Sequence, residues 1–416
     1  MIFLTASIAL ANGLSTHVWI TLAARETLPE GDLKELVNDP AIEDALRNGA
    51  QFPDGGYAVG DGYGEIAHWE PMQSELLDYI RDTWGPPPYT GEAAQHAAFL
   101  LGMASHCMGD QVFDANYIER VRVYDADSDY ANSFDEATDV AFMALTGGQP
   151  VPPLWVPEIM PSLFARQGHT VTQDTLEDGQ ALTGLAVNYV TLAAANPEAV
   201  AGYEAEWPWA TTHLEDPAAV GRPADEAVAV AWYWQKLWAR LQGDDAFDPP
   251  VLGTFPPDGG FGHPTQAASI ESRVVLVFSR GLIPDSLPPG TITVTDGAGH
   301  VYAPEPRVYY GQSSHVVLLQ PYEDWALDED FTVTVGPYAT SIAEQTMTEP
   351  WSFTFSTRPV PVAVDEEAPS APGCGCATAS PPATAAGLLL LAALCAQRRA
   401  VSRPGRAGTP DPTPRS

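Results

Sequence analysis

The chain of 416 residues carries 54 acidic and 19 basic residues, which gives a formal net charge of −35. A surface this acidic argues against nucleic acid as a partner and against electrostatic attraction to anionic lipid, and it favours a soluble protein outside the cell. With 45% hydrophobic residues, the chain is long enough for two domains, each with its own core.

The first eleven residues are apolar and end in Ala9-Leu10-Ala11, where small residues alternate as they do at signal-peptide cleavage sites. The run is short for a signal peptide and has no basic residue before it, so a first helix is the alternative. We expect residues 1–11 to be a signal peptide and the protein to be exported. Cleavage there would make Asn12 the mature N-terminus, close to His17.

Helical periodicity follows, and it predicts helices over 16–28, 33–47 (interrupted by Asp39-Pro40) and 71–84. The second of these helices should end near Gly49. Residues 51–64 are rich in glycine and predict a loop that carries Asp54 and Asp61. Carboxylates on loops are common metal ligands and also common turn residues, and composition alone favours a turn for Asp54.

The stretch 95–114 predicts a helix that its neighbours mostly bury, because apolar residues recur at three- and four-residue spacing and proline is absent. Residues four apart share a helix face, so His106, Asp110 and Asp114 should form one polar line. An imidazole and two carboxylates inside an apolar helix are unfavourable unless something pairs with them. A metal ion would do so; a His–Asp hydrogen bond at a helix end is the alternative.

Residues 124–139 are unusually acidic, with carboxylates at Asp125, Asp127, Asp129, Asp135, Glu136 and Asp139. The first three alternate as in a calcium loop, but the glycine that such a loop needs at position six is replaced by Tyr130. We therefore interpret this stretch as a solvated acidic loop.

A proline-rich stretch over 152–161 precedes two further predicted helices, over 176–194 and 223–241. The second carries Trp232, Trp234 and Trp238. Tryptophans at this spacing are usually core residues, although they could also line a pocket for acyl chains.

After Asp248 the pattern changes to short alternating runs, which predict strands over 273–279, 291–295, 307–310, 315–319, 331–335 and 351–356. Turn clusters such as Asp296-Gly-Ala-Gly separate them, which indicates a small antiparallel sandwich over 248–358. The segments around Thr254, Phe278 and Phe353 resemble the bacterial Ig-like modules of surface proteins. The resemblance implies a spacer or adhesive module.

The C-terminal region begins with a proline-containing linker over 359–382, which includes Gly373-Cys374-Gly-Cys376. An apolar segment and a basic stop at Arg398-Arg399 make up 383–399, and a disordered tail over 400–416 follows. The apolar run is short for a membrane span. Together these features resemble the C-terminal sorting tails of myxobacterial surface proteins. The resemblance implies processing by sorting machinery and a protein that is anchored to the outer membrane or cell surface through this tail, or secreted. The folded domains hold only Cys107, and so no internal disulfide.

The N-terminal third contains four motifs with potential metal ligands, in this order: Gly13-Leu-Ser-Thr-His17, Phe52-Pro-Asp54, Ala67-His68-Trp69 and Ser-His106-x-x-x-Asp110. In this order they resemble the zinc-dependent phospholipase C/D family, and most of all the N-terminal domain of glycosylphosphatidylinositol-specific phospholipase D. The likeness runs from Asn12 to Asp139 and more loosely to Gly243. It implies an all-α metal-binding domain over 12–247, of the phospholipase C/P1 nuclease type, followed by the Ig-like sandwich.

The resemblance also implies roles for individual residues. Asp54, His68, His106 and Asp110 match the ligands of the family's first zinc ion. His17, the terminal amine (of Asn12 after cleavage) and a bridging Asp110 match a second zinc ion, and Asp54 also matches the candidate general base.

The third metal position departs from the family's pattern, because two expected histidines are missing. Asp114 and Asp135 remain there, and an all-carboxylate pair suits Mg²⁺, Mn²⁺ or Ca²⁺ better than Zn²⁺. The number of bound ions, two or three, therefore stays open.

Zinc lowers the pKa of bound water to ~7 and so supplies hydroxide at neutral pH. The expected function is hydrolysis of phosphodiester bonds in phospholipid or glycolipid head groups at the cell surface. One alternative is a catalytically inactive, surface-tethered protein that binds metal or lipid. Another is a phosphodiesterase resembling single-strand nucleases, which the acidic surface disfavours. The choice between C-type and D-type cleavage stays open.

Overall fold

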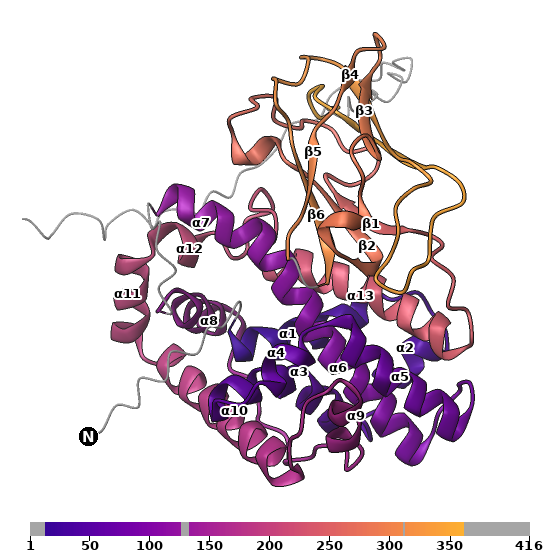
Figure 1. The fold of residues 1–416 in the computed structure, drawn as a ribbon. Coiled ribbons are helices and arrows are strands. Elements are labelled where there is room, and N and C mark those ends of the chain that lie inside the picture. The colour runs from indigo at the N-terminus through magenta and orange to yellow at the C-terminus, as the bar shows by residue number, and fades with distance from the viewer. Residues whose placement is uncertain (1–12, 126–132, 311–312, 362–416) are drawn as a thin grey trace, which may run out of the picture. The chain divides into compact units, whose positions relative to one another are not determined.

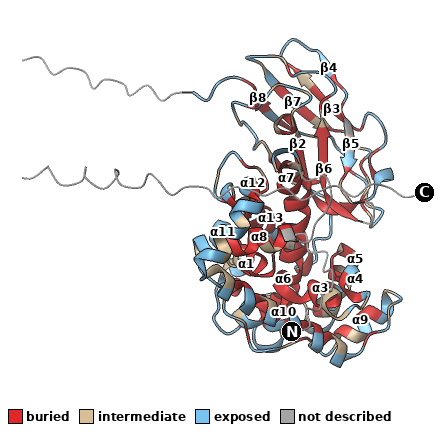
Figure 2. Cartoon of the chain, turned by 90° about the vertical axis from the view of Figure 1, so that its left-hand side faces the viewer, coloured by how far each residue is buried: buried red, intermediate tan, exposed pale blue. Residues whose placement is uncertain are grey.

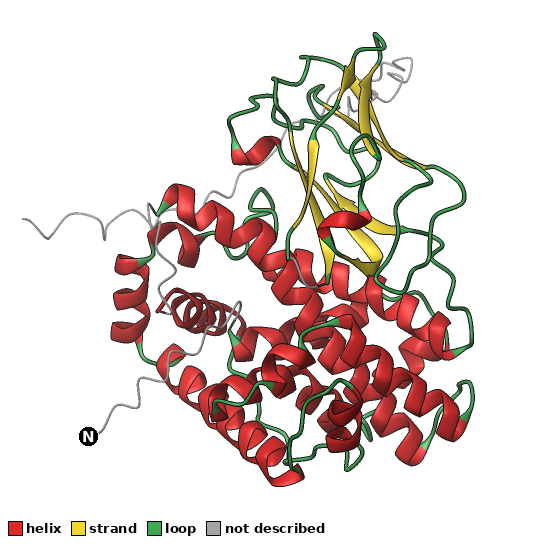
Figure 3. Cartoon of the chain, viewed as in Figure 1, coloured by secondary structure: helices red, strands yellow, loops and turns green. Residues whose placement is uncertain are grey.

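The computed structural model describes residues 13–125, 133–310 and 313–361. Helices make up the chain to Leu241, and strands begin at Val251, on either side of Asp248 (Figures 1 and 3). The helical region contains α1 (Leu14–Thr27), α2 (Asp32–Val37), α3 (Glu43–Val59), α4 (Tyr63–Ala67), α5 (Glu70–Trp84), α6 (Gly91–Phe113), the π-helix η1 (Asp114–Ile118), α7 (Glu119–Tyr124), α8 (Ser133–Thr146), α9 (Met160–Arg166), α10 (Gln173–Ala194), α11 (Pro197–Glu206), α12 (Pro208–Thr212) and α13 (Pro223–Leu241).

Helix α6 is the centre of this region, and every residue from Ala97 to Phe113 is buried (Figure 2). It packs against α1, α3, α5 and α13. The predicted helix over 95–114 is therefore present and buried. At Asp114 the backbone changes to a π-helix, a local feature that is often found at functional sites and that apolar periodicity cannot predict.

The prediction of a loop over 51–64 is wrong for Asp54, because α3 does not end near Gly49 but continues to Val59. Tertiary packing accounts for the difference. Helices α3 and α6 cross with their backbones in contact: a Cβ built on Gly49 would lie 2.2 Å from the carbonyl oxygen of Phe99. A Cβ on Gly102 would lie 2.2 Å from the carbonyl oxygen of Leu46. The glycines that resemble a loop in composition here permit a close helix crossing.

The prediction of a solvated acidic loop over 124–139 is also wrong in part. Asp135 and Asp139 lie on α8 and are 1% exposed. Asp125 accepts hydrogen bonds from the backbone N–H groups of Trp209 and Ala210, at 2.8 and 2.9 Å, at the start of α12. Asp127 and Asp129 lie outside the described residues. Asp125, Asp135 and Asp139 are therefore used inside the fold, where sequence composition predicts solvent.

The strand region is a sandwich of two antiparallel sheets. One sheet has the order β1-β2-β6-β5 and the other the order β4-β3-β7-β8. The strands are β1 (Val251–Phe255), β2 (Val274–Leu282), β3 (Ile292–Asp296), β4 (Val301–Tyr302), β5 (Glu305–Val308), β6 (Ser314–Gln320), β7 (Asp330–Val335) and β8 (Trp351–Ser356). All six predicted strands are present. The sequence pattern missed β1, which follows directly on two prolines, and the two-residue β4.

Strand β2 is buried on both faces. Val275 and Val277 belong to the core of the helical region, whereas Val274 and Leu276 belong to the core of the sandwich. Alternate residues of a strand point to opposite faces, so one sheet separates two hydrophobic cores. The residues up to Pro361 accordingly form one compact unit.

No helix within the described ranges is long and apolar enough to span a membrane. The expected signal peptide (1–11), Asn12, the cysteine motif, the apolar segment 383–399 and the tail 400–416 lie outside those ranges.

Candidate metal centre

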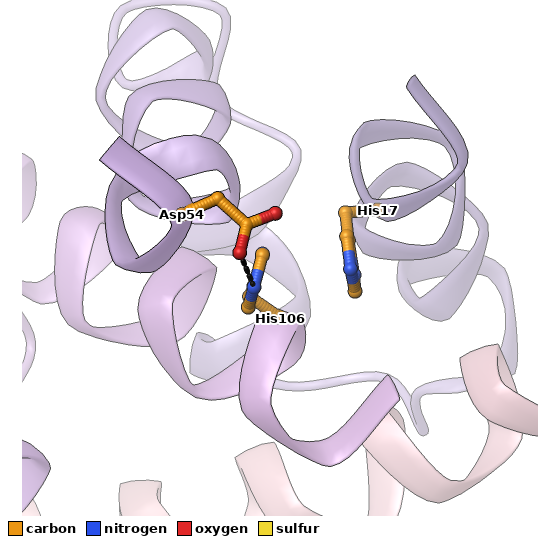
Figure 4. A group of neighbouring side chains, drawn as sticks. All are labelled: His17, Asp54 and His106. Carbon is orange, nitrogen blue, oxygen red and sulfur yellow. Dashed lines mark ion pairs between the residues drawn. The ribbon is translucent and has the colours of Figure 1, made fainter. Parts of the chain in front are cut away.

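Four segments of the helical region bring five of the predicted ligands together. They are His17 on α1, Asp54 on α3, His68 directly after α4, and His106 and Asp110 on α6. All five are at most 9% exposed. In Figure 4, Asp54 and His17 approach His106 from their separate helices. Three imidazoles and two carboxylates thus share one buried volume.

Four of these side chains place donor atoms close to the two imidazole nitrogens of His68 and His106. The Nε2 atoms of His68 and His106 lie 3.1 Å apart. Asp54 Oδ1 lies 3.6 Å from the first nitrogen and 3.5 Å from the second. Asp110 Oδ2 lies 3.3 and 3.4 Å from the same two nitrogens. Donors placed ~2.0–2.1 Å from one zinc ion at tetrahedral corners lie about 3.3–3.4 Å apart, close to the separations among His68, His106 and Asp110. In the described part of the chain, two sets of three side chains could each hold a metal ion: His68, His106 and Asp110, and His17, Asp54 and His106. The two sets share His106.

Backbone carbonyl groups hold the two imidazoles in this orientation. The Nδ1 atom of His68 lies 2.6 Å from the carbonyl oxygen of Gly64, and that of His106 lies 2.8 Å from the carbonyl oxygen of Ala50. A carbonyl can only accept, so each Nδ1 carries a hydrogen and each Nε2 faces the carboxylates of Asp54 and Asp110. Metal-binding histidines are oriented by this kind of outer hydrogen bond. Ala50 is four residues before Asp54, so one face of α3 supplies both a ligand and an orienting group.

His17 extends the cluster through Asp110. Its Nε2 atom lies 3.0 Å from Asp110 Oδ1, and its ring stacks on that of His106 with centroids 3.8 Å apart. Asp110 therefore offers Oδ2 to the first set of donors and Oδ1 to His17, as a bridging carboxylate would. The start of α1 is held by Asp139, which accepts hydrogen bonds from the N–H groups of Ser15 and Thr16 at 3.1 and 2.8 Å.

The protonation of the cluster follows from burial and from its own charges. Burial alone would raise the pKa of the Asp54 and Asp110 carboxyls, but His106 and the other imidazoles lower both below their usual value. Burial lowers the pKa of His68, yet Asp110 and Asp54 raise it overall to about 10. Burial and His17 lower the pKa of His106. Without a metal, one proton on His68 lies between two carboxylates.

The predicted third position is also buried. Asp114 and Asp135, on η1 and α8, are 2% and 1% exposed. Burial, followed by the charge of Asp110, raises the pKa of both well above the usual value. Within the described ranges, Oδ1 of each carboxyl has no hydrogen-bond partner. The other oxygen of Asp114, Oδ2, accepts a hydrogen bond from the hydroxyl of Tyr310.

Sequence reasoning missed Tyr310 as part of this site. It lies just beyond β5, in the sandwich, almost two hundred positions from Asp114 along the chain. No local pattern marks it, because its role depends on how the sandwich packs on the helices. The anchoring role of Asp139 was missed because it depends on how α8 packs against the start of α1.

The tryptophans of α13 have different environments. Trp234 is buried and donates a hydrogen bond to the carbonyl oxygen of Leu101 at 2.7 Å, as a core residue. Trp232 lines a cavity of about 720 Å³ together with Trp209 and Phe255. None of the five clustered ligands lines this cavity. The cavity is thus separate from the candidate metal centre.

Comparisons with known proteins identify the sandwich. Residues 245–357 match the family model of a bacterial Ig-like domain, so the strand region is a domain of this kind. The match does not extend into the helical region, and no curated protein matches the chain.

Among solved structures, the chain is similar to surface layer protein SbsC, domains 1–6, with 12% identity and a TM-score of 0.22. It is similar at the same identity and TM-score to the N-terminal part of the bacterial S-layer protein SbsC. The alignments cover 84% of this chain and 46% and 79% of those chains, so this chain spans less than half of the first. At that TM-score the likeness carries no argument about fold.

Proposed function

We propose that the chain is a metal-dependent phosphodiester hydrolase that acts on phospholipid or glycolipid head groups outside the cell. The observation that carries the proposal is the donor geometry. The Nε2 atoms of His68 and His106 and Oδ2 of Asp110 lie close to the separations of a tetrahedral zinc site, and Asp54 Oδ1 lies 3.5–3.6 Å from the same two nitrogens. The order of the four motifs supports the phospholipase C/D class. The substrate class rests on that resemblance.

The residues present fit two zinc ions. Asp54, His68, His106 and Asp110 would hold the first, and His17 with Asp110 would contribute to the second. Zinc in such a site supplies hydroxide at neutral pH and stabilises the charge that develops on a phosphodiester. Replacing the His68 proton with a divalent cation also adds one positive charge to a centre that contains two carboxylates.

Asp54 combines two features that matter for its role. Its lowered pKa keeps it ionised near neutral pH, as a ligand must be, and Oδ1 faces the two imidazoles. Its second oxygen, Oδ2, is buried and has no hydrogen-bond partner in the described part of the chain. We assign Oδ1 to the metal and Oδ2 to orienting the attacking water. A carboxylate with a lowered pKa is a weak general base, so this orienting role is favoured over full proton transfer.

Asp114 and Asp135 would hold a third, more labile cation such as Mn²⁺, Mg²⁺ or Ca²⁺, because carboxylate oxygens are the ligands that hard cations prefer. Activity should then rise with added Mn²⁺ or Mg²⁺ beyond what zinc alone supports. Asp114→Asn should abolish this response and leave the tightly bound zinc unchanged. An unchanged response in that variant would show that the third position binds no ion.

A catalytically inactive scaffold is the second candidate, because a proton on His68 can hold the same five side chains together without a metal. The two candidates differ in metal content and turnover. We expect the full chain, purified without chelator, to contain two zinc ions and to hydrolyse phospholipid or glycolipid phosphodiesters.

His106→Ala should lose both zinc and activity, whereas Asp258→Asn, in the Ig-like domain, serves as a control that should keep both. One ion without turnover would indicate the inactive protein. Cleavage of single-stranded nucleic acid in place of lipid would indicate the nuclease alternative. A chain that binds no zinc would refute the proposal.

The same proposal includes export and attachment at the cell surface. The bacterial Ig-like domain over 245–357 supports a surface or extracellular protein. The segment 383–399 would anchor the chain to the membrane after recognition by sorting machinery. Fractionation of cells that produce the full chain, compared with a chain that ends at residue 382, tests this attachment.

A further inference from the structure

Three of the contacts that join the Ig-like domain to the helical region meet that region at or beside a candidate ligand. They involve Glu70, which follows His68 by two residues, Gln111, which follows Asp110 directly, and Asp114 itself. A spacer or adhesive module, as the sequence implied, would need none of these contacts.

The first contact neutralises a buried carboxylate. Glu70 begins α5 and is 1% exposed. Its Oε1 accepts hydrogen bonds from Arg280 Nε at 2.5 Å and from Arg240 Nη1 at 3.2 Å, and its Oε2 accepts one from the backbone N–H of Gly281. Arg280 and Gly281 belong to β2. Strand β2 thus fixes the segment that directly follows His68.

The second contact fixes α6 at Gln111, the residue that directly follows Asp110. The side-chain oxygen Oε1 of Gln111, which is buried, accepts hydrogen bonds from the backbone N–H of His315 at 2.7 Å and from the Ser314 hydroxyl at 3.3 Å. Both residues are at the start of β6. A backbone donor of the sheet therefore holds the side chain next to the bridging carboxylate.

The third contact reaches the third metal position. The hydroxyl of Tyr310 donates to Asp114 Oδ2, and the rings of Tyr310 and Trp69 pack in a T-shaped arrangement with centroids 5.2 Å apart. Because Oδ2 is engaged, Oδ1 is the oxygen that Asp114 has available, and it has no partner in the described part of the chain. The same is true of Asp135 Oδ1. Outer hydrogen bonds of this kind orient ligating carboxylates.

We infer that the Ig-like domain helps to form the metal centre, and that Tyr310 is the positioning residue through which it acts. The Tyr310 hydroxyl holds the Asp114 carboxylate so that Oδ1 can bind a divalent cation together with Asp135. This inference rests on the third metal position of the proposed function. It also makes that position depend on a residue of the Ig-like domain.

The test is Tyr310→Phe in the full chain, which removes the hydroxyl and keeps the ring against Trp69. The zinc-loaded protein is titrated with Mn²⁺ and followed by electron paramagnetic resonance. We expect the affinity for Mn²⁺ to fall about 10–100-fold, as for other lost outer contacts, with the zinc content unchanged. Tyr338→Phe, at a site that is 70% exposed, is the matched control and should bind Mn²⁺ like the wild type.

Unchanged Mn²⁺ affinity in Tyr310→Phe would overturn the inference, even if the variant melts at a lower temperature, because a merely structural role changes only stability. A wild-type chain that binds no Mn²⁺ beyond its zinc would overturn it as well. The proposed function fails in a different way: a chain that binds no zinc, but binds Mn²⁺ in a manner that depends on Tyr310, refutes the hydrolase and retains the role of Tyr310.

Discussion

The proton on His68 must leave when a metal ion arrives, and this exchange can be measured. In the metal-free protein the carboxylates of Asp110 and Asp54 outweigh burial and raise the pKa of His68 from 6.5 to about 10. A metal ligand must be the neutral imidazole. The two carboxyls and His106 contribute no proton near neutral pH, because all three have lowered pKa values.

The size of the effect follows from these pKa values. At about pH 7.5, an imidazole with a pKa of about 10 is more than ~99% protonated, whereas one with the ordinary value is about 10% protonated. Binding of the first ion should therefore release about one proton from His68, against about 0.1 if the side chain were unperturbed. Ionisation of bound water adds to the total, so the quantity of interest is the difference between wild type and His68→Gln.

Calorimetric titration with zinc in two buffers of different ionisation enthalpy gives the number of protons released. We expect the wild type to release about one proton more than His68→Gln. Nuclear magnetic resonance of the metal-free imidazole provides a second measurement, with a titration midpoint well above 8. A midpoint near 6.5, or equal proton release by the two proteins, would refute the view that His68 is charged between two carboxylates.

Three further predictions concern stability. The pKa of His68 is higher in the folded protein than in the unfolded chain, so protonation of His68 stabilises the metal-free fold. This stabilisation should be present in full below about pH 6.5 and be lost as the pH rises through about 10. Denaturation at a series of pH values with chelator present measures it. Gly102→Ala places a Cβ 2.2 Å from the carbonyl oxygen of Leu46 and should destabilise by about 1–3 kcal/mol with loss of zinc. Gly202→Ala, where nothing lies within 4 Å, should instead be neutral or stabilise by about 0.5–1 kcal/mol, and equal melting temperatures for the two variants would contradict the close crossing. Asp139→Ala removes the acceptor at the start of α1 and should lower the free energy of unfolding by about 0.5–2 kcal/mol in urea titrations; no change would mean that water replaces the carboxylate.

The periodicity of apolar residues predicted several of the helices and strands correctly. The helices 71–84 and 223–241 and six strands follow from it, as does the burial of α6. Asp54 shows where composition fails, since Pro53, Gly55 and Gly56 resemble a loop but lie within α3. The helix continues there because its packing against α6 outweighs the local preference of these residues.

In the candidate site, too, the sequence predicts the features that depend on local spacing and misses those that depend on long-range packing. His106 and Asp110 share a helix face, which spacing reveals, and motif order joins them to His17 and His68. The role of Tyr310 depends on the docking of a sheet far along the chain, and no neighbouring residue signals it. The burial of Asp135 likewise contradicts the solvated appearance of its acidic neighbours.

The burial of β2 on both faces determines how the protein unfolds. Val275 and Val277 belong to one core, while Val274 and Leu276 belong to the other. Melting of either core would expose the sheet that the other requires, so neither can persist as a folded intermediate. In calorimetry, the unit that extends to Pro361 should therefore unfold in a single cooperative transition. Proteins built from independent domains instead unfold one domain after another.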